Sequence, residues 1–121
     1  MGQTVAILGA SKNPERFSYR AFRMLSDYGH RPVPVSPKMK ELEGVPVYES
    51  LKDLKGPIDT LTMYVGPDRS TALSDQILAL HPKRVIFNPG SENPTLARAL
   101  EKSGVQVIED CTLVMLQEGT F

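Results

Sequence analysis

The apolar run Val5–Leu8 stops at Gly9 and is followed, after a short polar turn, by a helical pattern that opens near Ser18. An uninterrupted apolar run of this length is typical of a buried strand in a parallel sheet. A strand that ends at a glycine and leads into a helix presents the free backbone amides of the helix start to an anion. This one segment therefore predicts a strand–turn–helix unit and a site for a phosphate group.

Strand and helix patterns alternate along the rest of the chain. Such alternation predicts one α/β domain over residues 1–121, doubly wound and Rossmann-like, with the first strand beside the switch point. Helices are expected over Ser18–Tyr28, from Ser50, over Gly66–Leu80, from Asn93 to Gly104 and over Thr112–Leu116. The mostly parallel sheet has five main strands, predicted at Val5–Leu8, Pro32–Ser36, Thr60–Val65, Arg84–Asn88 and Val105–Glu109, plus a short edge strand at Val45–Tyr48.

Pro32 and Pro34 lie in the second predicted strand and remove two backbone donors from it. Because alternate residues of a strand point their amides to the same side, both missing donors face one neighbour. That neighbour should pair weakly, and the short segment Val45–Tyr48 fits this role.

Composition narrows the class of partner. Lysine and arginine total 14, as do aspartate and glutamate, so the net charge is zero. A neutral chain does not bind nucleic acid through overall basicity, although it can still self-associate as a homo-oligomer. The single cysteine, Cys111, fits a reducing compartment, and neither a signal peptide nor a membrane-length apolar run is present. We therefore expect a cytoplasmic protein with no membrane partner.

The first loop only partly follows the G-x-G-x-x-G pattern of dinucleotide sites. Gly9 holds the first glycine position, whereas Ser11 and Pro14 replace the other two. One interpretation of such an incomplete pattern is a strand–turn–helix connection that binds no ligand. Hydrogen-bond donors nevertheless accumulate before the helix, where the helix dipole also attracts anions. Those donors are Ser11, Lys12, Asn13, Arg16 and Ser18.

The loop after the second strand discriminates between nucleotide ligands. NAD sites carry an acidic residue there, which binds the ribose hydroxyls. This chain has Ser36-Pro37-Lys38 followed by Met39 and Lys40. Lysines at this place favour a phosphate on or near the ribose, as in NADP or in the 3′-phosphate of coenzyme A. A solvated charged loop is the alternative, and it suits Lys40 better than Lys38, which directly follows the strand.

Several motifs in this order resemble the small stand-alone CoA-binding domain proteins, and the same module is similar to the N-terminal domain of the succinyl-CoA synthetase alpha subunit. The resemblance covers nearly the whole chain. It rests on Gly9-Ala10-Ser11 with Pro14, Ser18-Tyr19-Arg20, Pro34–Lys38, Gly44–Tyr48 with Ser50-Leu51, and Asp110-Cys111.

The resemblance implies a coenzyme A or acyl-CoA site made by the first loop, the lysine after the second strand and the loop after the central strand. Two features depart from the family pattern: Phe17 replaces a polar residue, and Asn88–Ser91 replaces a more apolar turn. The residues that the resemblance implies as ligands of CoA are Gly9, Ala10, Ser11, Ser18, Lys38, Val65 and Pro67. Arg16, one of the hydrogen-bond donors that precede the first helix, is a further candidate.

The sequence contains no recognisable set of catalytic residues. His30 and His81 precede strands, at the edge of the sheet opposite the predicted pocket, and we interpret them as solvated loop residues. Cys111 follows the last strand without a histidine to activate it, so burial is the favoured interpretation and a mixed disulfide with CoA a second one. Asp110 suits either a ligand hydroxyl or the cap of the next turn. No Cys/His cluster predicts a metal site.

Three functions remain open on the sequence. The first, which we prefer, is a small-molecule nucleotide-binding module for CoA or an acyl-CoA, without its own chemistry. The second is an NADP-dependent reductase or a synthetase-like subunit with a partner protein. The third is an interaction protein that has lost tight ligand binding, which Phe17 and the Asn88–Ser91 loop would favour.

Overall fold

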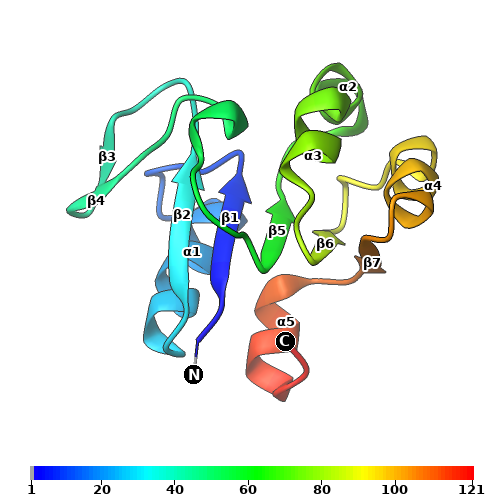
Figure 1. Ribbon diagram of the computed structural model, residues 1–121. Helices are drawn as coiled ribbons and strands as arrows, with labels where there is room; N and C mark the ends of the chain where they lie inside the picture. The colour runs from blue at the N-terminus through cyan, green and yellow to red at the C-terminus, as the bar shows by residue number, and fades with distance from the viewer. Residues whose placement is uncertain (1) are drawn as a thin grey trace.

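A five-stranded parallel sheet forms the centre of the computed structural model, which describes residues 2–121 (Figure 1). The spatial order is β2-β1-β5-β6-β7, so the direction of chain progression reverses between β1 and β5. This reversal puts the switch point beside the first strand, and the predicted doubly wound, Rossmann-like α/β class is confirmed. The strands are β1 (Thr4–Leu8), β2 (Arg31–Val35), β5 (Thr60–Met63), β6 (Arg84–Phe87) and β7 (Gln106–Glu109).

Helices cover both faces of the sheet, and the first strand is apolar on both sides. In β1, Val5 and Ile7 pack with α1 and α5, whereas Ala6 and Leu8 pack on the other face with α3 and α4. Within residues 2–121 no helix is long and apolar enough to cross a bilayer. The helices are α1 (Phe17–Asp27), α2 (Pro67–Ala72), α3 (Ser74–Leu80), α4 (Pro94–Lys102), α5 (Thr112–Glu118) and the 3₁₀ helix η1 (Leu51–Asp53).

Two helix predictions need correction. The single helix predicted over Gly66–Leu80 is divided into α2 and α3 at Leu73. At the division the Ser74 hydroxyl donates back to the Thr71 carbonyl over 2.8 Å, a local bond that bends helices. Tyr28, the last residue of the helix predicted over Ser18–Tyr28, is 51% exposed and lies outside α1. It lies one residue beyond the helix end, where Gly29 turns the chain with φ +85°.

The outer edge of β2 pairs as weakly as its prolines predict. Only one bridge joins it to the expected partner segment, between Val35 and Tyr48. Ser36, the first residue after the prolines with an outward amide, donates to the Tyr48 carbonyl over 2.9 Å. The start of that segment, β4 (Val45–Pro46), instead pairs with β3 (Glu41–Leu42) in a separate antiparallel hairpin, which lies to the left of β2 in Figure 1.

Asn88 gives the sheet a buried polar tie just after β6. Its amide nitrogen donates to Thr62 Oγ1 over 2.7 Å and to the Met63 carbonyl over 2.8 Å. Its side-chain oxygen accepts the Thr112 amide over 2.8 Å. Asn88 therefore connects β5, β6 and the start of α5, and the loop that departs from the family pattern has a structural role.

We expect Asn88→Ala to lower the free energy of unfolding by about 2–4 kcal/mol, because it leaves the buried Thr112 amide without an acceptor. Urea unfolding of both proteins measures the difference. Asn13→Ala is the matched control, since Asn13 is exposed and its side chain accepts one local bond, from the Glu15 amide. Equal stability of the two variants would contradict this role for Asn88.

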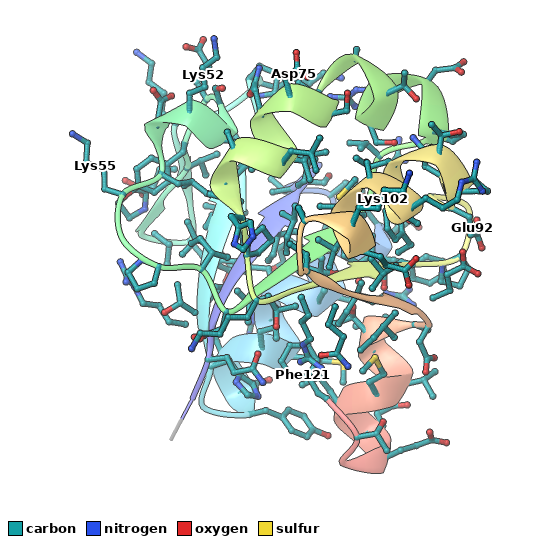
Figure 2. The ribbon with its side chains drawn as sticks, turned by 45° about the vertical axis from the view of Figure 1, so that its right-hand side comes forward. Lys52, Lys55, Asp75, Glu92, Lys102 and Phe121 are labelled. Carbon is teal, nitrogen blue, oxygen red and sulfur yellow. The ribbon has the colours of Figure 1, made fainter. Side chains whose placement is uncertain are left out.

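The opposite edge of the sheet is closed by a second polar cluster around Gln3 and Arg84. Arg84 Nε donates to Thr60 Oγ1 over 2.7 Å, and its guanidinium lies 4.4 Å from the centre of the Phe121 ring. Figure 2 shows Phe121 at the end of the molecule opposite Lys52 and Asp75. His30 Nδ1 accepts the Gln3 amide over 3.0 Å, so His30 is a structural residue as well as a loop residue.

Burial and the neighbouring Arg84 guanidinium lower the pKa of His30 below its usual value. A histidine whose pKa is lowered by folding stabilises the protein only while it is neutral. We therefore expect the free energy of unfolding to fall as the pH drops from about 7 to about 5, the range in which histidine titrates. His30→Asn keeps an acceptor for Gln3 and should flatten this slope in urea unfolding.

His81→Asn, which removes the other histidine of the same edge, is the control for that experiment. The pH range of this experiment ends at about 5, because the titration of Asp59 contributes to stability at more acidic pH. The pKa of Asp59 is also lowered by folding, chiefly by the hydrogen bond that it accepts from the Thr4 amide. A slope that persists in His30→Asn would contradict the assignment.

Candidate functional site

A pocket of about 360 Å³ opens at the carboxyl ends of the parallel strands, where ligands bind in doubly wound sheets. Four strand-end loops line it: those after β1, β2, β5 and β6. The loop after β7, Asp110–Thr112, does not line it. Asp110 Oδ1 accepts the Cys111 amide over 2.7 Å instead, which is the capping interpretation of that residue.

The structure brings most of the predicted site residues together in this pocket. Pro67 is the exception: it begins α2 and does not line the cavity. The seven predicted residues in the lining are Gly9, Ala10, Ser11, Arg16, Ser18, Lys38 and Val65.

Gly9 allows the ends of three strands to meet at the pocket floor. Its φ is +93°, and a Cβ at this position would lie 3.0 Å from the Tyr64 carbonyl oxygen and 3.0 Å from Val65 Cγ1. Only glycine fits both the conformation and the contact. The Gly9 and Ala10 amides both donate to the Val35 carbonyl, over 3.2 and 3.1 Å. The end of β1 is therefore fixed to β2 on one side and to β5 on the other.

The start of α1 faces the pocket with unbound amides. The N-cap residue is Arg16, whose side chain caps none of these amides. The helix ladder begins with the Arg20 amide donating to the Arg16 carbonyl over 3.2 Å. The first amides of α1, at Phe17 and Ser18, precede that bond and have no acceptor one turn earlier in the helix. Together with the helix dipole they favour an anion at this end of the pocket.

Local hydrogen bonds fix the two loops that flank the helix start. Ser11 Oγ accepts the Asn13 amide over 3.1 Å, which leaves the Ser11 hydroxyl proton to donate elsewhere. Ser36 Oγ, buried at the end of β2, accepts the Lys38 amide over 3.2 Å. This bond curls the loop back on the strand end, so Lys38 lines the pocket rather than continuing away from it.

Every charged side chain in the lining is a cation: Arg16, Lys38 and Arg69. Within residues 2–121 none of these three forms an ion pair, since the two ion pairs there join Arg23 to Glu43 and Lys83 to Asp59. Arg69 was not predicted from the sequence, because it lies inside α2 rather than in a strand-end loop. The pocket is therefore electrostatically suited to a ligand with several negative charges.

Two aromatic residues complete the lining. Tyr64 lies at the floor, and burial raises its pKa to about 12, so the phenol stays neutral and does not act as a base near neutral pH. Phe17 lies at the mouth, 63% exposed, with the Arg20 guanidinium 5.6 Å from its ring centre. The polar lining thus ends in an apolar rim.

Relatives share this chain's sequence over most of its length. Residues 3–117 match the CoA binding domain family. An uncharacterized protein, YneT of Bacillus subtilis strain 168, is 27% identical over 106 residues, which cover 88% of this chain and 78% of that protein. The alpha subunit of the ADP-forming acetate–CoA ligase II of Pyrococcus furiosus is 35% identical over 66 residues. That match covers 54% of this chain but only 14% of the subunit.

Solved structures agree with the sequence comparison. A Thermus thermophilus protein, described as cell-free ID.343, superposes with a TM-score of 0.91 at 34% identity, over 99% of this chain and 91% of that one. The family match extends from β1 to α5 and includes every loop that lines the pocket. The chain belongs to the CoA-binding domain family.

Proposed function

We propose that the pocket binds coenzyme A or an acyl-CoA and that the chain works as a binding module without chemistry of its own. The observation that carries this proposal is the set of cations around the open start of α1: Arg16, Lys38 and Arg69, with no carboxylate from residues 2–121 in the lining. A nucleotide with a diphosphate and a further phosphate supplies the matching charges. Family membership supports CoA over other nucleotides of that description.

Each part of the ligand has a suitable counterpart. The first amides of α1, with Ser11 and Ser18, would hold the diphosphate. Lys38, curled towards the pocket by Ser36, would neutralise a phosphate. Val65 would contact the adenine or its ribose, and the apolar mouth at Phe17 would accept the less polar part of the ligand.

A ligand that binds the folded state raises its melting temperature. We expect CoA and acetyl-CoA to stabilise the protein in a thermal-shift panel more than NADP, NAD or ATP do. Preferential stabilisation by NADP would instead support the reductase alternative. If no ligand in the panel shifts the melting temperature and the protein forms a stable oligomer, the result would support the interaction-protein alternative.

Lys38→Glu should weaken CoA binding by about 10- to 100-fold in calorimetry, as expected for the loss of about 1.5–3 kcal/mol of charge-assisted bonding. Lys40→Glu is the matched control. It makes the same change of charge on the same loop, but Lys40 does not line the pocket, so its effect should be within about threefold. Equal losses of affinity in both variants would show that the effect comes from net charge, and this would contradict a direct contact between Lys38 and CoA.

A second candidate is a CoA-binding partner subunit of a ligase, favoured by the similarity to the acetate–CoA ligase alpha subunit. The matched segment is a small part of that subunit, so this role would require another polypeptide. Incubation of the chain alone with acetate, CoA and ATP tests whether the chain has chemistry of its own. Formation of ADP would show an enzyme and would overturn the binding-module proposal.

A further inference from the structure

A second hollow of about 230 Å³ adjoins the first, between the ends of β1 and β2 and the helices η1 and α3. Its walls are mainly apolar, from Leu8, Val35, Leu51 and Leu73. Ser50 Oγ donates to Gln76 Oε1 over 3.0 Å at its polar end. The first pocket has three cations and the open helix start. The second has Arg69 and the carboxylate of Glu49 in a mainly apolar lining, which suits a flat, weakly polar ring system such as a nucleotide base.

Gly9, Pro37 and Arg69 line both hollows and therefore mark their junction. Gly9 has no side chain and Pro37 has no charge. Arg69 is thus the one cation of the described chain that reaches both hollows, because Arg16 and Lys38 line the first alone. It is exposed, and within residues 2–121 no carboxylate pairs with it.

The covalent order of a nucleotide determines what lies at such a junction. The ribose connects the base to the 5′-diphosphate. With the base in the apolar hollow and the diphosphate at the start of α1, the ribose lies between them. A phosphate on that ribose then faces the junction cation. The guanidinium fork of arginine binds phosphate oxygens in pairs, which fits a terminal phosphate better than a bridging diphosphate.

We propose that Arg69 binds the ribose phosphate of coenzyme A and makes the site selective for 3′-phosphorylated nucleotides. This inference rests on the proposed function, since it assigns one phosphate of that ligand to one side chain. Arg69 is then a residue that determines specificity. The other anion-binding groups of the first pocket bind the diphosphate.

Calorimetry with CoA and with 3′-dephospho-CoA tests the assignment. The intact protein should bind CoA at least about tenfold more tightly, as expected for one charge-assisted contact. Arg69→Gln should lower the affinity for CoA by a similar factor and leave that for dephospho-CoA within about twofold, so that the preference disappears. Arg69→Lys, which keeps the charge but not the fork, should retain part of the preference.

Arg98→Gln is the matched control, because it removes one exposed arginine from α4, outside both hollows. It should leave both affinities unchanged. Equal losses for the two ligands in Arg69→Gln would assign Arg69 to the shared diphosphate and overturn the proposal, as would a preference that survives the substitution. An intact protein that binds neither ligand would overturn the proposed function itself, and the wild-type measurement alone reveals that case.

Discussion

The close approach of Gly9 to the end of β5 is the constraint on which the rest of the site depends. A side chain there would meet the Tyr64 carbonyl oxygen, a backbone atom that cannot move without moving β5. The same residue donates to Val35 at the end of β2. The spacing of three strand ends, and with it the floor of the first pocket and the junction to the second, follows from the absence of one carbon atom.

Much of the fold could be predicted because its signals are local. Asn93-Pro94 predicts the start of α4, and Asn93 Oδ1 does accept the Leu96 amide over 3.1 Å. The division of the helix at Leu73 could not be predicted in the same way. It depends partly on distant contacts, since Asn93 Nδ2 donates to Ser70 Oγ over 2.8 Å and to Thr71 Oγ1 over 3.0 Å. Such contacts between separate loops have no sequence pattern.

The candidate site was predictable where it consists of strand ends. Lys38 follows β2 directly, so a correct strand places it at the pocket edge. Pro67 and Arg69 show the limit of that reasoning. Both follow β5, but α2 turns Pro67 away from the pocket and brings Arg69 into its lining two residues later. The direction of a short helix depends on its packing against the neighbouring loops, which the sequence does not reveal residue by residue.

The prolines of β2 also bear on how copies of this chain can meet. An open sheet edge is a template for a strand from another molecule, because its backbone groups are free to pair. Pro32 and Pro34 offer no proton along the β2 edge, and the one position that does, Ser36, is already engaged with Tyr48. A foreign strand finds no continuous ladder there. Intermolecular strand addition to this sheet is therefore confined to the opposite border, β7, far from the loops that hold the phosphate-binding groups.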